Sequence, residues 1–428
     1  MNLQDFLKRK TVQNINWLIG GKIIQMILSF FIGLITARYL GPSNFGLINY
    51  ATAYTTFFSS LCTLGLNGIL VKEMVDYPES EGEILGTSIL IRGVSSFFSF
   101  LTIVGCSLIM DRSDVSTVVV VILCNFSLIF QVFDTFNYWF QAHLLSKYTA
   151  ISTLVGYTAV SLYRIILLIL GMDVRWFAFA TTVDYIVIAI LLYLLYKRYS
   201  NQKLTVSFIR AKNMLGKSYH FILSGMMVSI YNSTDRLMLK QMMTETSVGY
   251  YSTAIAICTM WAFVLIAIID SLTPSIMQSF KSNYDKYKKR NKQLYSIIFY
   301  VSTFVSIILC IFGELIIKIL YGNEFLPAVA PLRIITWYVA FSYLGSARNA
   351  WLVCENKQKY LKYIYIFAVI ANVGLNYFLI PLWGASGAAF ASLITQFCTC
   401  IVFPGFLKPL RENSKLMIES IFLRGVFK

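Results

Sequence analysis

The sequence predicts an all-α polytopic membrane protein with about twelve transmembrane helices in two six-helix halves. Three observations lead to this fold class. The composition is strongly apolar, with 57% hydrophobic and 13% charged residues and a mean hydropathy of +0.67, whereas soluble domains carry roughly 25% charged residues. Apolar stretches long enough to cross a bilayer recur along the whole chain. A faint internal repeat relates the first half of the chain to the second.

Each expected membrane helix is an apolar stretch of about 20 residues or more, the length that crosses the hydrocarbon. In order, the stretches are 15–37, 45–71, 84–110, 115–140, 148–171, 174–196, 218–241, 247–273, 294–320, 327–353, 360–382 and 385–407. They lack the alternating pattern of barrel strands, and helices satisfy their own backbone polar groups in lipid. Nearly all of the eight prolines fall at expected helix ends, where the missing N–H costs least. The eight cysteines lie in or beside these spans, which indicates buried thiols rather than disulfides.

Basic residues predict the orientation. Of the 36 Lys and Arg residues, 25 fall at the N-terminus, in the even-numbered connections and in the C-terminal tail, so both termini are expected in the cytoplasm. The net charge of +16 therefore reflects topology and does not indicate a nucleic-acid partner. The expected organisation is an N-lobe (1–196), a cytoplasmic linker (197–217), a C-lobe (218–407) and a basic amphipathic cytoplasmic tail (408–428). The tail is expected either to lie on anionic lipid as an interfacial helix or to be solvated.

The internal repeat is visible in two places. The stretch ARYLGPSNFGLINYATA (37–53) is echoed by SVGYYSTAIA (247–256), and aligning Gly46 with Gly249 gives an offset of 203 residues. Later, FAFATTV (177–183) matches AAFASLI (388–394) at an offset of 211. Because each half holds an even number of spans, both halves enter the membrane in the same sense. This arrangement is a parallel repeat about an axis along the membrane normal.

Polar residues recur at helical spacing on single faces of three expected spans, which is typical of helices that face water or another helix. The stripes are Lys22, Gln25, Ser29, Gly33 and Thr36; Asn49, Thr52, Thr56, Ser59, Thr63 and Asn67; and Ser224, Val228, Asn232, Asp235 and Arg236. At the offset of 203, Ser29 aligns with Asn232 and Gly33 with Arg236. We interpret the first and third stripes as two walls of one hydrated cleft; buried helix contacts are the alternative.

Inside the expected spans, basic residues outnumber acidic residues. The cations are Lys22, Arg92, Arg164, Arg236, Arg333 and Arg348, and the carboxylates are Asp134, Asp184, Asp235 and Asp270. Each charge costs at least about 2.5–3.5 kcal/mol at the bilayer centre, so such residues usually have a use. Arg164 and Asp184, on consecutive spans, are expected to form a structural ion pair. The remaining cations favour an anionic substrate, and Arg suits phosphate through its paired donors.

The chain lacks motifs for catalysis or ATP binding. The stretch AKNMLGKS (211–218) fits a loose phosphate-binding loop, but it has no preceding strand and no room for a βαβ unit, so no ATPase is expected. The only two histidines, His143 and His220, offer no metal-ligand spacing, and no nucleophile motif is found. No cofactor or metal is expected, and transport would have to draw on a gradient of H⁺ or Na⁺.

Several stretches resemble a known family. They are ARYLGPSNFGLINYATA, LGLNGILVKE (64–73), STDRLMLKQMMTETSVGYYSTA (233–254), LYGNEFLPA (320–328) and ANVGLNYFLIPLWGASGAAFAS (371–392). Together they are similar to the polysaccharide transporters of the multidrug/oligosaccharidyl-lipid/polysaccharide (MOP) exporter superfamily, and within these to the Wzx-type O-antigen flippases. The resemblance covers essentially the whole chain. It implies twelve helices in two six-helix lobes, and a multi-pass protein of the bacterial cytoplasmic (inner) membrane.

The resemblance also implies an activity, which is the flipping of an undecaprenyl-pyrophosphate-linked oligosaccharide from the cytoplasmic to the periplasmic leaflet without enzymatic chemistry. A polysaccharide polymerase and a chain-length regulator would be further partners. On this basis we expect the pyrophosphate to contact Lys22, Arg38, Arg92, Arg236, Arg333 and Arg348. We expect the sugars to contact Asn49, Asn67 and Asn232. Asp235 or Asp270 would carry the coupling H⁺ or Na⁺.

Two other functions remain open at this stage. A drug/cation antiporter of the same superfamily would share the fold, but it predicts an acid-rich rather than a cation-rich cleft. A membrane-embedded glycan polymerase or ligase predicts a long outer loop with acidic or His residues, whereas all expected outer connections here are short.

Overall fold

The computed structural model describes residues 3–200 and 202–426, with the side chains of 3–19, 22 and 23 outside the description. Every regular element in these ranges is helical, which confirms the all-α fold class. Within these described ranges, ten helices are long and apolar enough to cross a membrane. One of the ten, Ile24–Asp76, contains the first two expected spans in one run. The expected seventh span is not among the ten, because polar and charged side chains run along its helix.

The chain divides into two compact units. Unit 1 comprises Met1–Leu40 and Leu47–Ser229, and unit 2 comprises Gly41–Gly46 and Ile230–Lys428. The boundary falls inside one helix, α9 (Phe208–Met242), so the end of one unit and the start of the next share a continuous backbone. The lobe limits expected from the sequence stay a prediction.

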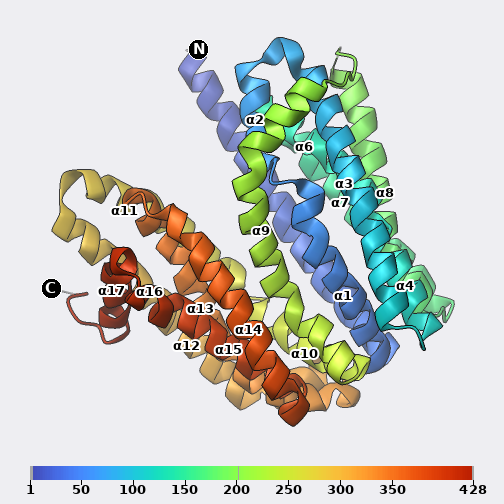
Figure 1. Cartoon of the computed structure of the whole chain (residues 1–428), viewed down its shortest axis with the longest axis vertical. Coiled ribbons are helices and arrows are strands. Elements are labelled where there is room, and N and C mark those ends of the chain that lie inside the picture. Colours follow the sequence, from blue (N-terminus) through green and yellow to red (C-terminus); the bar gives the residue numbers. More distant parts are fainter. Residues whose placement is uncertain (1–2, 201, 427–428) are drawn as a thin grey trace. The chain divides into compact units, whose positions relative to one another are not determined.

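Among the described residues, unit 1 contains the first nine α-helices, of which α1 lacks Gly41–Gly46 and α9 belongs to it only in part (Figure 1). They are α1 (Leu3–Thr63), α2 (Asn67–Asp76), α3 (Glu81–Met110), α4 (Val115–Asn125), α5 (Ser127–Gln131), α6 (Thr135–Ala142), α7 (Ser146–Ile169), α8 (Val174–Tyr199) and α9 up to Ser229. Short 3₁₀ turns cover Pro78–Ser80 and Val132–Asp134. The core packs apolar and aromatic side chains of α2, α3, α6 and α8.

Two expected elements of unit 1 differ from the sequence prediction. The fourth expected span is broken into α4, α5, a 3₁₀ turn and α6. Near the breaks, the hydroxyls of Ser127 and Thr135 donate to the carbonyls three residues earlier, which competes with the helical ladder. The expected linker is also shorter, since α8 ends at Tyr199 and α9 begins at Phe208, which leaves Ser200 and 202–207 as the described non-helical residues. Thr205 N–H donates to the Gly82 carbonyl, so this short segment is tied to α3.

Unit 2 contains the rest of α9 and the remaining helices (Figure 1). They are α10 (Glu245–Thr259), α11 (Ala262–Ser282), α12 (Tyr284–Leu320), α13 (Val329–Cys354), α14 (Leu361–Trp383), α15 (Ala385–Phe397), α16 (Phe403–Phe406) and α17 (Arg411–Ile421). Short 3₁₀ or π turns cover Asn323–Ala328, Gln358–Tyr360, Cys398–Val402 and Lys408–Leu410. Side chains of Thr244 and Asn283 cap the starts of α10 and α12 by accepting backbone N–H groups.

The C-terminal tail is part of unit 2. Helix α17 packs on α12, and its Leu416 and Met417 lie in the unit's hydrophobic core. Lys292 pairs with Glu419 at 2.5 Å, and Lys288 pairs with Glu412 at 2.8 Å. The tail is therefore docked on its own unit by apolar contacts and by ion pairs. A freely solvated tail, one of the two expectations, is not what the described residues show.

The repeated stretch forms a close helix crossing inside unit 2. Helix α1 breaks at Gly41, whose φ of 68° is left-handed, and the following turn packs on α10. A Cβ on Gly46 would lie 1.8 Å from the Glu245 carbonyl oxygen, and a Cβ on Gly249 would lie 2.1 Å from that of Pro42. The two contacts are related by the repeat, since each partner lies 203 residues from its counterpart. Only glycine permits this backbone approach.

Candidate functional site

A buried carboxylate at the centre of a polar cluster is the main candidate site. Asp235 on α9 is 6% exposed, and four side chains of unit 2 donate to it. The amides of Asn372 and Asn376 donate to Oδ1 at 3.0 and 2.6 Å. The hydroxyls of Tyr251 and Ser392 donate to Oδ2, the latter at 2.5 Å. We call these five residues the Asp235 cluster.

The sequence positions the cluster through helix periodicity. On α14 the buried residues recur every fourth position, as Ile364, Ala368, Asn372, Asn376 and Ile380. Residues four apart lie on one helix face, so both asparagines face the core of the unit. Tyr251 lies on α10 and Ser392 on α15, both of which contribute buried faces to the same core. Four helices therefore converge on one carboxylate.

The electrostatics of the cluster depend on hydrogen bonds rather than on an ion pair. A charge in an apolar interior is costly unless it is paired or hydrogen-bonded. Among the described residues no basic group lies within 4.0 Å of the Asp235 carboxylate. The neighbouring Arg236 is half-buried, and its Nη2 donates to the Asn232 carbonyl of its own helix at 3.3 Å. The four donors thus compensate the carboxylate.

The chemistry of the cluster suits a proton or a hard cation. Asn376 Oδ1 is buried and has no hydrogen-bond partner in the described part of the chain. With the Asp235 carboxylate, the Asn372 carbonyl and the two hydroxyls, it forms a set of oxygen ligands, the kind that hard cations prefer. No group of three His, Cys, Asp or Glu side chains that could hold a metal ion is found among the described residues. A transition-metal site is therefore not indicated there.

The other expected site residues of unit 2 lie in different environments. Asn232, Asp270 and Arg333 are exposed, and Arg333 Nε donates to the Cys310 carbonyl at 3.2 Å. Arg348 is 4% exposed, and its Nη1 donates to two carbonyls of the Cys398–Val402 turn at 3.3 Å each. Arg333 and Arg236 thus remain accessible, whereas Arg348 connects α13 to the end of α15. Phosphate binding by all three stays a prediction.

The expected site residues of unit 1 are similarly divided. Arg38 and Asn67 are exposed, Asn49 is half-buried, and the Lys22 side chain lies outside the described residues. Arg92 is 1% exposed, and it donates to Thr135 Oγ1 at 2.7 Å and to the carbonyls of Cys62 and Gln131 at 3.4 and 3.5 Å. Arg92 therefore joins α1 and α3 to the broken fourth span. A pyrophosphate would have to displace these bonds.

The expected ion pair between Arg164 and Asp184 is wrong. The two side chains are not within 4.0 Å, and Arg164 Nε and Asp184 Oδ1 are buried atoms without hydrogen-bond partners. Asp184 Oδ1 lies 3.3 Å from the Cβ position of Gly156. Gly156 is eight residues from Arg164 on α7, or about 12 Å along a helix axis. The two side chains therefore form no direct ion pair, although their charges interact electrostatically.

Unit 1 has a charged pocket of its own. A cavity of about 570 Å³ is lined by Gly65, Gly68, Ile69, Lys72, Glu73, Asp76, Tyr77, Lys217 and Phe221. Lys217 precedes the expected seventh span, and it donates to Glu73 at 2.5 Å. This hydrogen bond raises the pKa of Lys217. Arg210 binds Glu73 and Glu83 at 3.6 and 2.9 Å, so Glu73 is shared by two basic residues.

Sequence reasoning found Asp235 but missed its four partners. Asn372, Asn376 and Ser392 all lie in the stretch ANVGLNYFLIPLWGASGAAFAS, and Tyr251 lies in the echo of the first repeat. The sequence signal that could have revealed them is the pair Asn372 and Asn376, which lie four residues apart in an otherwise apolar expected helix. Such a pair must find polar partners on a facing helix.

The chain shares its fold with solved membrane transporters. Over 95% of its length it matches the inward-facing conformation of a multidrug resistance MATE family transporter of the MOP superfamily, with a TM-score of 0.69, 16% identity and 99% of that chain covered. It also matches the lipid II flippase MurJ in an inward closed conformation, with a TM-score of 0.69, 14% identity, and 96% and 92% of the two chains covered. The architecture is therefore that of the MOP superfamily.

The sequence comparison gives the family. A family model described as "Polysaccharide biosynthesis protein" matches residues 11–280, and the chain belongs to this family. The capsular polysaccharide biosynthesis protein CapF of Staphylococcus aureus is 20% identical, over 93% of this chain and 99% of that protein. An uncharacterized membrane protein of Methanocaldococcus jannaschii, MJ1068, is 21% identical, over 98% and 89% of the two chains. The resemblance noted in the sequence is thereby confirmed.

Proposed function

We propose that this protein is a flippase that carries an undecaprenyl-pyrophosphate-linked oligosaccharide across the bacterial cytoplasmic membrane. The observation that carries the proposal is the polysaccharide biosynthesis family match over 11–280, together with ten helices of membrane-spanning length and apolarity in the described part of the chain. The name of the Staphylococcus aureus relative and the fold shared with a lipid II flippase support a lipid-linked sugar as substrate. The protein would act as a transporter, without bond-making chemistry.

In this proposal, accessible arginines contact the pyrophosphate. Arg236 is half-buried and Arg333 is exposed, and no carboxylate lies within 4.0 Å of either side chain in the described residues. A guanidinium binds phosphate oxygens with two parallel hydrogen bonds, which offsets the cost of bringing the head group into a membrane protein. The prenyl chain would stay in lipid while the head group crosses by alternating access.

The Asp235 cluster would couple this movement to an ion gradient. A carboxylate in a water-poor site can exchange a proton or hold a Na⁺ ion, and the unpartnered Asn376 Oδ1 supplies a further ligand. Binding of the ion would change which hydrogen bonds join α9 to α14 and α15. This coupling role is the part of the proposal that Asp235 variants test.

Reconstitution tests the substrate directly. Purified protein in liposomes would be given a fluorescent undecaprenyl-pyrophosphate-linked oligosaccharide, and an impermeant glycosidase would report the outer-leaflet fraction. We expect protein-dependent transfer, stimulated by a H⁺ or Na⁺ gradient. In cells, Arg236→Ala and Arg333→Ala should abolish surface polysaccharide with unchanged protein in the membrane, whereas Lys281→Ala should not. Normal polysaccharide in both arginine variants would remove these residues from the mechanism.

A drug/cation antiporter is the second candidate. The fold shared with a multidrug resistance transporter and the buried Asp235 favour it. This function predicts that expression in a drug-sensitive host raises resistance to cationic drugs. Resistance without any transfer of the lipid-linked sugar in liposomes would replace the flippase proposal.

A further inference from the structure

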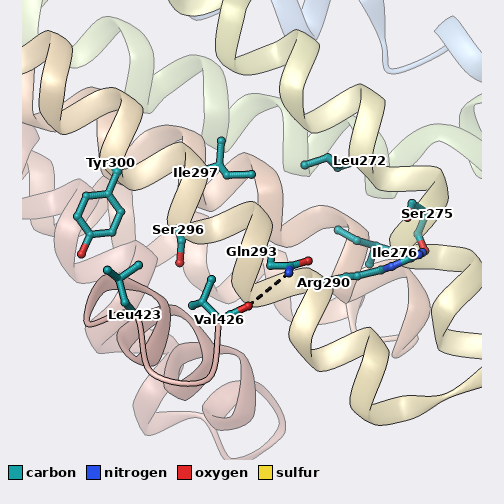
Figure 2. A pocket seen from close by; sticks show the side chains of 10 residues that line it. All are labelled: Leu272, Ser275, Ile276, Arg290, Gln293, Ser296, Ile297, Tyr300, Leu423 and Val426. Carbon is teal, nitrogen blue, oxygen red and sulfur yellow. Dashed lines mark hydrogen bonds between the residues drawn. The ribbon is translucent and has the colours of Figure 1, made fainter. Parts of the chain in front are cut away.

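A cavity of about 410 Å³ lies in unit 2 (Figure 2), and none of its lining residues belongs to the Asp235 cluster. Three segments enclose it, namely α11, α12 and the chain after α17. Its lining residues are Leu272, Ser275 and Ile276 from α11, Arg290, Gln293, Ser296, Ile297 and Tyr300 from α12, and Leu423 and Val426. Nothing in the proposed transport mechanism uses this cavity.

The walls of the cavity are mostly apolar, and part of them is accessible. Ile297 and Leu423 are 41% and 40% exposed, whereas Ile276 and Val426 are buried at 1% and 3%. Leu272 completes the apolar lining. An accessible apolar hollow of this kind suits a hydrocarbon chain, because burying apolar surface is favourable.

Most polar groups of the lining already have partners. Gln293 Nε2 donates to the Val426 carbonyl at 3.3 Å, the bond drawn in Figure 2. Ser296 Oγ donates to the Ser420 carbonyl at 2.9 Å, and Tyr300 Oη donates to that of Ile421 at 2.8 Å. These three bonds hold the C-terminal segment against α12, so they shape the cavity and leave few donors for a ligand.

Arg290 is the exception. Its Nη1 donates to the Ser275 carbonyl at 2.5 Å, and no carboxylate lies within 4.0 Å of it in the described residues. Its Nε and Nη2 have no partner there. Figure 2 shows the side chain reaching from α12 toward Ser275 and Ile276, along the edge of the cavity. The cavity therefore combines apolar walls with an available guanidinium, which prefers phosphate.

The position of the cavity along α12 matches the edge of the hydrocarbon. The first turns of α12 hold five basic residues, the last being Lys292, and the next charged residue is Glu314. The uncharged run of 293–313 is about the length that crosses the hydrocarbon. Exposed apolar side chains continue along this helix from the cavity, at Ile297, Tyr300, Phe304, Ile307 and Ile311. The cavity thus adjoins an exposed apolar stripe of α12, and Arg290 lies where the basic turns meet the uncharged run.

We propose that this cavity binds an anionic phospholipid, with the phosphate on Arg290 and one acyl chain against Ile297, Leu272 and Leu423. The bound lipid would contact both α12 and the residues after α17, so it would stabilise the docked C-terminal segment. The site is distinct from the transported substrate and from the coupling ion.

Lipid titrations on the full-length protein in non-ionic detergent test the proposal. The probes are phosphatidylglycerol, phosphatidylcholine with the same acyl chains, inorganic phosphate and undecaprenyl phosphate. Bound lipid is counted by native mass spectrometry, and the thermal shift gives the apparent affinity. We expect phosphatidylglycerol to bind about tenfold more tightly than phosphatidylcholine, as a charge-assisted phosphate contact allows. Inorganic phosphate should neither shift the melting temperature nor compete.

Three variants separate the contributions of the guanidinium and the cavity. Arg290→Gln should remove the tenfold preference for phosphatidylglycerol, whereas the neighbouring Lys289→Gln, with the same change in charge, should keep it. Ile297→Trp fills the cavity from an exposed position and should reduce binding of both phospholipids. If Arg290→Gln does not fold, Ile297→Trp decides the matter. In the titrations, the proposal is overturned if the two phospholipids bind equally, if inorganic phosphate competes with phosphatidylglycerol, or if undecaprenyl phosphate binds more tightly than phosphatidylglycerol. Among the variants, it is overturned if Arg290→Gln and Lys289→Gln have equal effects, or if Ile297→Trp binds both phospholipids as the unmodified protein does.

Discussion

Replacing Asp235 by asparagine and by leucine should give two different defects. Asparagine keeps the shape of the side chain, and its Oδ1 can accept from the amides of Asn372 and Asn376 as the carboxylate does. Its own N–H groups can donate to the hydroxyl oxygens of Tyr251 and Ser392, because a hydroxyl both donates and accepts. The hydrogen bonds therefore survive and only the charge is lost. We expect the free energy of unfolding to change by about 1–2 kcal/mol at most.

Leucine removes the acceptor altogether. Asn372 and Asn376 are both 0% exposed, so their amide donors to Asp235 cannot turn to water. Each buried donor left without a partner costs about 1–3 kcal/mol, which gives about 2–6 kcal/mol for the pair. Tyr251 and Ser392 would retain the weak 3.5 Å contact between their own hydroxyls, and Ser392 Oγ would still accept from Asn372 Nδ2 at 3.5 Å. A typical protein is stable by only 5–15 kcal/mol, so Asp235→Leu should be markedly unstable.

The assay combines thermal unfolding in detergent with gradient-driven transfer of lipid-linked oligosaccharide in liposomes. We expect Asp235→Asn to melt close to the unmodified protein but to lose the response to the H⁺ or Na⁺ gradient. Asp285→Asn, an exposed carboxylate at the start of α12, is the matched control and should change neither property. Asp270→Asn, measured in the same way, tests the second expected coupling residue. A full gradient response in Asp235→Asn would exclude the coupling role, and normal stability of Asp235→Leu would refute the energetic argument.

Three further predictions concern other parts of the fold. Gly249→Ala should lower the melting temperature by a measurable amount in detergent, because its Cβ would lie 2.1 Å from a backbone carbonyl oxygen; Gly93→Ala, with nothing within 4 Å, should be neutral. Burial alone would raise the pKa of Glu412, but the hydrogen bond and charge of Lys288 outweigh it and lower the pKa. The ion pair therefore stabilises the docked tail at pH values above the ordinary Glu pKa, and this stabilisation is lost as the pH falls through the lowered pKa. When melting temperatures are measured from pH 6 to pH 3, they should decrease less steeply in Lys288→Gln than in the unmodified protein. Arg92→Met should reduce the amount of folded protein in the membrane, because Arg92 donates hydrogen bonds to three uncharged groups of unit 1. A variant present at full abundance that has lost polysaccharide export would instead indicate that Arg92 contacts the substrate.

Much of the fold could be predicted because membrane helices leave a strong one-dimensional signal. Length and apolarity located the spans, and the repeat came from matched residues such as Gly46 and Gly249. The partners of Asp235 could not be predicted, because they lie on three other helices whose relative rotation depends on packing. For the same reason the direct ion pair expected between Arg164 and Asp184 was wrong: their helices were known to be adjacent, but the positions of the side-chain ends were not. Burial also separates residues that look alike in sequence, since Arg92 is enclosed and Arg333 is exposed.

The crossing at Gly46 and Gly249 has a consequence for the history of the chain. The two turns touch through main-chain atoms, so the contact does not depend on any particular side chain nearby. After a gene duplication, the two copies could therefore drift apart at almost every other position and still fit together at this point. A bulkier residue at either glycine would have broken the match at once. This is consistent with a sequence similarity between the halves that is clear around these glycines and weak along most of the chain.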